Sequence, residues 1–236
     1  MSGRSATVLQ LGEVDVSAAV LADRGVPLAR LIGDHGANSV DDLDGRPPTD
    51  GWRVIHGDLV HPGEVLPIVA ASWPIGGPDT WIVIRAYRAD GQWQTAVEGT
   101  GVVARPGRAV RRAGLALEWV TEPATVARGT SPDLRLVLRN IGQQWWTADG
   151  NDDNYVEVWA VGQDGDDFPR AGADFGDMGA VVVDVLPSLE PGIAVAVTAA
   201  WRHPAGARNL PAGRYVLRAR LLCLHLDAPP AALTVY

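Results

Sequence analysis

The sequence predicts an all-β protein built from two sandwich-like domains, and three observations carry this prediction. Hydrophobic residues make up 47% and charged residues 20% of the 236 residues, which is typical of a folded chain rather than a disordered one. Glycine (27) and proline (17) are frequent, and they separate short apolar runs with a period of two. The length fits one or two domains of ordinary size.

The first half of the chain gives the less regular pattern. Ser17 is placed to cap a short helix over residues 18–23, because Gly25 and Pro27 follow and would end it. Residues 33–51 are rich in glycine, aspartate, asparagine and proline, and we predict a long loop there. The predicted strands of this half span residues 6–16, 65–71, 81–87 and 99–104.

The second half carries the clearest strands. Apolar residues alternate with other residues in several runs, which is the pattern of half-buried antiparallel strands. Turn residues such as Pro191-Gly192 separate these runs, and such punctuation favours a β-sandwich. The runs cover residues 134–139, 156–160, 193–197 and 215–220. Residues 221–226 are apolar except for His225, so we predict a central strand covered on both faces.

An arginine-rich segment is the predicted link between the domains. Residues 105–112 contain four arginines, a composition that favours an exposed, solvated linker and also suits binding to an acidic partner. The predicted organisation is therefore an N-terminal β-rich domain over residues 1–104, a linker over 105–113 and a C-terminal domain over 114–236. A weak similarity between residues 81–91 and 155–165 fits either a duplicated domain or chance likeness between two strands.

Charge excludes one class of partner. The net charge is −8, and nucleic-acid binding calls for a clustered basic surface, so we expect no nucleic-acid partner. Lysine is absent and all twenty basic residues are arginine, which we attribute to a GC-rich bacterial genome. Residues 149–184 hold ten acidic residues against Arg170 alone, so the negative charge is concentrated there.

The compartment is predicted from what the chain lacks. No apolar run reaches the roughly 18 residues of a membrane helix, so no membrane association is expected. The first ten residues do not form a secretory signal, which favours the cytoplasm, or secretion if an upstream leader was removed. Cys223 is the single cysteine, which excludes an intrachain disulfide.

The second half also shows a recurring order of short motifs. An apolar strand ending in Asn140-Ile141-Gly142 is followed by Trp145-Trp146, by Pro191-Gly192 and by a Gly-x-Tyr-x-Leu run at Gly213. Over residues 134–236 this order resembles immunoglobulin-like β-sandwich modules of the four-tryptophan type. Such modules occur in an autophagy cargo receptor and as accessory domains of bacterial proteins. The acidic insertion over residues 149–184 departs from their pattern.

The resemblance implies a fold and a kind of role. It implies two immunoglobulin-like β-sandwich domains in tandem, if the first half is a related domain. Modules of this group bind proteins or accompany catalytic domains, and they are not catalytic themselves. In sandwich folds a tyrosine such as Tyr215 returns its hydroxyl to the backbone, and we expect the same corner here.

Tryptophans are the candidate binding residues. The chain has nine, and tryptophan is enriched in interface hot spots as well as in cores. Because Trp145 and Trp146 are adjacent on an extended segment, one should enter the core and the other should face solvent or a partner. The candidate binding residues are Trp145, Trp146 and Trp159.

No catalytic motif emerges. Without lysine there is no phosphate-binding Gly-x-x-x-x-Gly-Lys motif and no lysine Schiff base, and no Gly-x-Ser-x-Gly motif is present. Cys223 and His225 lie in an apolar run, which indicates core packing, and the spacing of His56 and His61 matches no zinc motif. We therefore predict that the protein is not an enzyme and needs no cofactor apart from a possible calcium ion.

The calcium hypothesis rests on one acidic turn. Asp149, Asn151 and Asp153 offer oxygen ligands at alternate positions, which is how calcium loops gather several ligands from one segment. The turn lacks the glycine and the distal glutamate of an EF-hand loop. Two alternatives stay open, namely a solvated acidic loop and a docking site for a basic partner.

These observations lead to two hypotheses from different classes. The first is a non-enzymatic protein-binding or assembly module, whose partner is another protein or a second copy in a homo-oligomer. The alternative is a carbohydrate-binding module with exposed tryptophans and a structural calcium ion.

Overall fold

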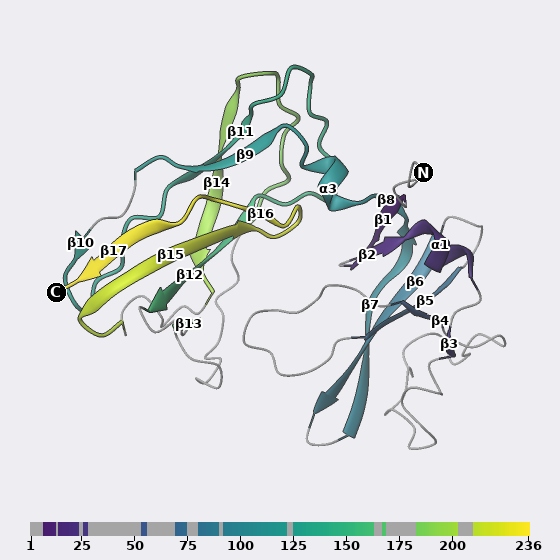
Figure 1. The fold of residues 1–236 in the computed structure, drawn as a ribbon. Helices are drawn as coiled ribbons and strands as arrows, with labels where there is room; N and C mark the ends of the chain where they lie inside the picture. Colours follow the sequence, from purple (N-terminus) through teal and green to yellow (C-terminus); the bar gives the residue numbers. More distant parts are fainter. Residues whose placement is uncertain are drawn as a thin grey trace, which may run out of the picture. The chain divides into compact units, whose positions relative to one another are not determined.

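The computed structural model divides the chain into two compact units, Met1–Val110 and Arg111–Tyr236, called here the N-terminal and C-terminal units. It describes residues 7–12, 14–23, 26–27, 53–55, 69–74, 80–89, 92–121, 125–162, 167–168, 183–202 and 210–236. Strands dominate both units, and the described helices are the short α1 (Ala18–Ala22) and α3 (Arg108–Arg111) (Figure 1). The all-β prediction is confirmed.

A small three-stranded sheet opens the N-terminal unit. It has the order β2-β1-β8, from β1 (Val8–Leu11), β2 (Val14–Ser17) and β8 (Arg105–Pro106). The prediction of one strand over residues 6–16 was wrong, because the chain reverses near Gly12, whose positive φ of 57° suits glycine. The predicted cap is confirmed: the Ser17 side chain accepts a hydrogen bond from the backbone N–H of Ala19, 3.2 Å away, at the start of α1.

The second sheet of this unit is a five-stranded antiparallel meander. Its strands, in spatial order, are β3 (Val26–Pro27), β4 (Arg53–Ile55), β5 (Val69–Pro74), β6 (Thr80–Ala89) and β7 (Gln92–Val103). The β6–β7 register shifts around Val83, so Val83 and Ile84 are both fully buried and the predicted alternation is broken there. The predicted loop over residues 33–51 lies outside the described residues.

The boundary between the two units lies inside the arginine-rich segment, between Val110 and Arg111, but the segment is not exposed throughout as its composition predicted. Arg105 and Pro106 form β8 and pair with β1. The side chain of Arg108 is buried, its backbone N–H donates to Asp15 Oδ1 at 3.1 Å, and its guanidinium lies 3.8 Å from Asp15 Oδ2. A guanidinium tolerates burial when a carboxylate pairs with it, and Asp15 supplies that partner from β2.

The C-terminal unit is one curled sheet. Its seven-strand path has the order β10-β17-β15-β12-β14-β11-β9, with β13 beside β12 and β16 beside β15 (Figure 1). The strands are β9 (Leu115–Trp119), β10 (Thr125–Val126), β11 (Leu136–Asn140), β12 (Tyr155–Gly162), β13 (Asp167–Phe168), β14 (Ala194–Trp201), β15 (Gly213–Leu221), β16 (Leu226–Asp227) and β17 (Ala231–Val235).

Strand β14 joins the two halves of this sheet. Its first half, residues 194–197, pairs antiparallel with β11, and its second half, residues 198–201, pairs parallel with β12. A strand that changes partners in this way turns the sheet through a corner. The inward residues of β9, β11, β12 and β15 therefore pack against one another, and Leu117, Leu138, Val158 and Leu221 are among the fully enclosed side chains.

The segment after β15 corrects another prediction. Residues 221–226 are not a central strand: Leu221 ends β15, residues 222–225 form a turn with His225 at a φ of 47°, and Leu226 begins β16. The apolar run is explained by burial within this turn, where Cys223 and Leu224 enter the core. The core position predicted for Cys223 is confirmed.

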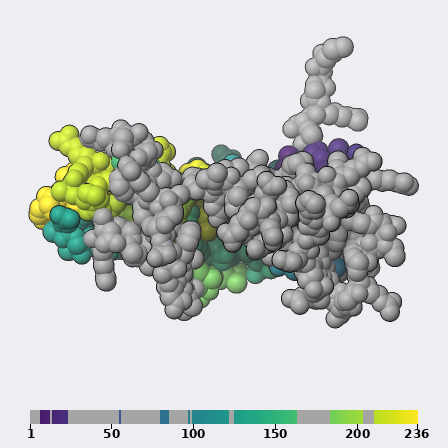
Figure 2. Space-filling model, turned by 90° about the horizontal axis from the view of Figure 1, so that it is seen from below, coloured from purple at the N-terminus to yellow at the C-terminus, as the bar shows by residue number. Residues whose placement is uncertain are grey.

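The predicted tyrosine corner is present. The hydroxyl of Tyr215, a buried residue of β15, donates to the backbone oxygen of Pro211 at 2.8 Å. The last strand, β17, buries Ala231, Leu233 and Val235, and the C-terminal end of the chain, in yellow in Figure 2, leaves Tyr236 exposed.

Candidate functional site

The two adjacent tryptophans separate as predicted. Trp146 is 8% exposed and its indole Nε1 donates to the backbone oxygen of Arg111 at 2.6 Å. Its backbone exchanges two hydrogen bonds of 2.9 Å with Leu189, which holds the segment in place. Trp145 is 62% exposed. One tryptophan therefore anchors the segment in the core, and its neighbour is presented to solvent.

Asn140 is the centre of the turns around Trp145. Its side chain is buried, and its Nδ2 donates to the backbone oxygens of Gln144 at 2.8 Å and Leu189 at 2.9 Å. Its Oδ1 accepts from the backbone N–H of Gly142 at 2.9 Å. Both donors and the acceptor of the amide are thus used, which is the condition for burying such a group at little cost.

A close backbone approach explains the glycine of the Asn-x-Gly motif. The carbonyl oxygen of Gly114 accepts hydrogen bonds from Ile141 and Gly142, so the two segments touch. A Cβ added to Gly142 would lie 3.2 Å from Asn140 Oδ1 and 3.4 Å from the Cα of Gly114. A larger residue would have to push Asn140 Oδ1 back by a few tenths of an ångström, so glycine suits this close approach.

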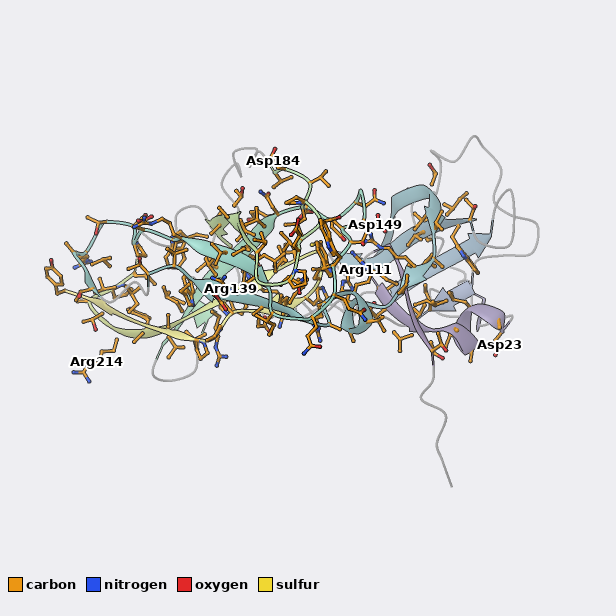
Figure 3. The ribbon with its side chains drawn as sticks, turned by 90° about the horizontal axis from the view of Figure 1, so that it is seen from above. Asp23, Arg111, Arg139, Asp149, Asp184 and Arg214 are labelled. Atoms are coloured by element: carbon orange, nitrogen blue, oxygen red, sulfur yellow. The ribbon has the colours of Figure 1, made fainter. Side chains whose placement is uncertain are left out.

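The turn at residues 190–193 is also hydrogen-bonded to Asn140 and Arg139. The backbone N–H of Asn140 donates to Ile193 at 3.0 Å, and its carbonyl accepts from Gly192 at 2.8 Å. Arg139, labelled in Figure 3, donates through Nη1 to the carbonyl of Gly192 at 3.2 Å and through Nε to Glu118 at 2.9 Å. The turn at 190–193 is therefore bound to the end of β11 by backbone and side-chain hydrogen bonds.

These turns carry three exposed apolar side chains, which we call the apolar end. Ile141, Trp145 and Ile193 are between 51% and 62% exposed, and their segments meet at Asn140. In the sequence we expected Ile193 to face inward with Val195, which was wrong, because Ile193 precedes β14 and lies in the turn. Ile141 was missed because a single apolar residue in a turn gives no periodic signal, and Ile193 was missed because its alternation with Val195 fits a strand equally well.

Trp159 lies elsewhere in the same unit. It is buried on the face of β12 opposite Val158, and the Arg202 guanidinium stacks over its ring at 4.4 Å from the centroid. Arg202 is also 2.9 Å from Glu157 Oε2. The indole of Trp159 therefore offers its ring to Arg202, and the structure does not bring it together with Trp145.

The acidic turn uses its own carboxylates for hydrogen bonds. Asp149 Oδ1 accepts from the backbone and side-chain N–H groups of Asn151, both at 3.2 Å, and Asp153 Oδ1 accepts from the backbone of Tyr155 at 3.1 Å. Burial, followed by the charges of Glu157 and Asp153, raises the pKa of the Tyr155 hydroxyl. Among the described residues, no group of three or more His, Cys, Asp or Glu side chains could hold a metal ion.

Asp152, which lies between the calcium-ligand candidates Asn151 and Asp153, pairs with an arginine instead. Asp152 is buried, forms an ion pair with Arg111, and accepts a hydrogen bond from the backbone N–H of Asp149 at 3.0 Å through Oδ2. Figure 3 shows Arg111 beside the turn that carries Asp149. The one fully buried carboxylate of the described turn at 149–154 is thus neutralised by an arginine.

We expect millimolar calcium to leave the melting temperature of the protein unchanged. The Oδ1 atoms of Asp149 and Asp153 accept hydrogen bonds within their own loop, and among the described residues they belong to no group of three or more His, Cys, Asp or Glu side chains that could hold the ion. Differential scanning calorimetry with and without calcium measures this directly. A rise in melting temperature that disappears in Asp153→Ala would contradict the expectation and support the calcium hypothesis.

Within the described part of the chain, no helix has both the length and the apolar character needed to cross a membrane. Comparison with models of protein families, with curated proteins and with solved structures found no match to this chain. We therefore infer a function from the geometry of the apolar end.

Proposed function

We propose that this chain is a non-enzymatic protein-binding or assembly module that binds its partner through the apolar end. The observation that carries the proposal is the exposure of Ile141, Trp145 and Ile193 on turns joined by the buried Asn140. Apolar anchors held on ordered turns lose little conformational freedom on binding. Tryptophan is also the residue most enriched in interface hot spots.

We further propose that the C-terminal unit is an immunoglobulin-like sandwich of the four-tryptophan type. The tyrosine corner at Tyr215, the core position of Trp146 and the Pro191-Gly192 turn support this assignment. The antiparallel meander of the N-terminal unit is the only support for a second such domain, so the tandem arrangement stays a prediction.

The proposal is tested by replacing Trp145. Once a partner is captured and identified, Trp145→Ala should weaken its binding about 30-fold, which corresponds to the ~2 kcal/mol of a hot-spot residue. Isothermal titration calorimetry measures the change in Kd. Tyr236→Ala is the matched control, because it removes another exposed aromatic side chain that lies after β17.

Two results would overturn the proposal. Equal effects of Trp145→Ala and Tyr236→Ala would show that the apolar end is not the binding surface. Specific binding to a glycan array that is lost in Trp145→Ala, with no protein partner, would favour the carbohydrate-binding alternative.

A further inference from the structure

Strand β15 presents a row of exposed side chains on the side of its sheet that faces away from the core. Its odd-numbered residues from Tyr215 to Leu221 are buried, whereas Arg214, Val216 and Arg218 are exposed. Because successive residues of a strand face opposite sides, these three side chains share one face, and we call them the arginine row. Figure 3 shows the side chain of Arg214 pointing away from the ribbon.

The neighbouring strands supply no acid to the arginine row. Thr234 of β17 stands opposite Arg214, and Trp159 of β12 stands opposite Arg218. Among the described residues, no carboxylate forms an ion pair with Arg214 or Arg218. Both guanidiniums therefore carry a charge that their surroundings on the sheet do not neutralise.

The acids of the strands beside the row are already paired with other arginines. Asp227 of β16 accepts hydrogen bonds from Arg220 at 2.7 Å and 3.0 Å, and Glu157 Oε2 of β12 lies 2.9 Å from Arg202 Nη2. The chain holds 28 acidic and 20 basic residues, so its composition does not force an arginine to go without an acid. Two such arginines on one face leave a local positive charge on a protein whose net charge is −8.

The spacing within the row selects the shape of a ligand. Four residues of a strand span about 13 Å, so Arg214 and Arg218 are farther apart than the ~8 Å screening length at physiological ionic strength. One carboxylate therefore cannot neutralise both, and each guanidinium needs an anion of its own. Val216 lies midway between them and is 40% exposed, so it offers an apolar contact. An extended segment with acidic residues at positions i and i+4 and an apolar residue at i+2 presents these three groups on one face with the same spacing.

We propose that the arginine row binds an extended acidic segment of a partner protein, with one acidic residue on each arginine and an apolar residue on Val216. Pairs of guanidinium and carboxylate are frequently bidentate, which fixes the position of the segment along β15. The net charge of −8 repels acidic segments from the rest of the protein, so charge complementarity favours this face. The row is separate from the apolar end, whose residues lie on turns outside β15.

Titration of the ¹⁵N-labelled full chain with the synthetic peptide Gly-Glu-Thr-Val-Thr-Glu-Gly, followed by NMR, tests the proposal. Saturable shifts are expected for amides of β15 and β17. Raising the ionic strength from about 0.01 M to about 0.15 M should weaken binding roughly threefold or more, because salt screens exposed ion pairs. The peptide Gly-Glu-Glu-Thr-Val-Thr-Gly has the same composition with its acids adjacent, and it should bind roughly threefold more weakly or worse, since it reaches one arginine at a time.

Charge reversal within the row supplies the second readout. Arg218→Glu should raise the Kd of the first peptide about tenfold or more, because repulsion replaces attraction at one of its two charged contacts, and Arg214→Glu should do the same at the other. Arg135→Glu is the matched control: it makes the same change in net charge at an exposed arginine that precedes β11 and pairs with Asp133 at 2.7 Å. It should leave the Kd within about twofold.

Four results would overturn the proposal. They are the absence of saturable shifts in β15, equal binding of the two peptides, equal effects of Arg218→Glu and Arg135→Glu, and tighter binding of a single-stranded oligothymidylate than of the first peptide, which would favour nucleic acid as the ligand. Loss of peptide binding in Trp145→Ala, with Arg218→Glu unaffected, would also overturn it and would place the peptide at the apolar end.

Discussion

Replacing Asp152 with alanine is expected to lower the free energy of unfolding of the C-terminal unit by about 3–5 kcal/mol, the typical cost of removing one partner of a buried ion pair. Asp152 and Arg111 are 1% and 10% exposed, so the substitution leaves a guanidinium in the interior without its carboxylate. It also removes the acceptor for the backbone N–H of Asp149. Denaturant unfolding followed by hydrogen exchange at amides of β12 and β15 measures the stability of this unit.

The ion pair between Arg220 and Asp227 provides the matched control. Its Nε–Oδ1 distance is 2.7 Å, but its side chains are 32% and 55% exposed. Exposed pairs contribute about 0–1 kcal/mol and are screened by salt, so Asp227→Ala should have a small effect that shrinks further in salt. Equally small effects of both substitutions would mean that Arg111 remains solvated in the folded unit.

The sequence predicted features that depend on neighbouring residues. Trp145 and Trp146 separate because successive residues of an extended segment face opposite sides, and this holds wherever the segment packs. The cap at Ser17 and the corner at Tyr215 involve partners two and four residues away. Period-two alternation likewise revealed the longer strands β11, β12, β14 and β15 of the C-terminal unit.

Features that depend on distant partners were missed. Arg108 was expected in solvent because the segment 105–112 is rich in arginine, but Asp15, 93 residues earlier, makes its burial possible. Asp152 was read as one of several clustered acids, but its partner Arg111 lies 41 residues away. Composition reports the average surroundings of a segment and cannot identify one pairing that reverses them.

The change of partners along β14 was also missed. Its alternating pattern is the same whether the strand pairs with β11 or β12, so periodicity predicts the strand and not its neighbours. The turn at residues 222–225 was misassigned because buried turn residues and buried strand residues are equally apolar.

Asn140 makes one hydrogen bond that the local sequence predicted and others, to distant residues, that it did not. The Asn-x-Gly motif predicted the local turn, which the structure contains as the hydrogen bond from Gly142 to Asn140 Oδ1. It did not predict the hydrogen bond to Leu189, 49 residues later, which ties the turn to the segment that carries Ile193. That long-range hydrogen bond holds the parts of the apolar end together with the backbone hydrogen bonds that Asn140 makes to Gly192 and Ile193.

Replacing Asn140 with leucine is therefore expected to lower the free energy of unfolding of the C-terminal unit by about 2–4 kcal/mol, because three hydrogen bonds of about 0.5–1.5 kcal/mol each are lost. A side chain of similar size keeps the volume filled, and the N–H of Gly142 and the carbonyl of Leu189 keep their backbone partners Gly114 and Trp146. The same hydrogen-exchange measurement reports this change.

Asn151→Leu is the matched control, because Asn151 is exposed and its side-chain hydrogen bond stays within its own turn. It should change stability by no more than about 0.5 kcal/mol. Asn140→Leu should also increase hydrogen exchange in residues 141–145 and 190–193 before the unit unfolds, since these turns lose their common partner. If exchange there is unchanged, the backbone hydrogen bonds of Gly114 and Gly192 suffice to order the apolar end, and Asn140 is not what preorganises it for binding.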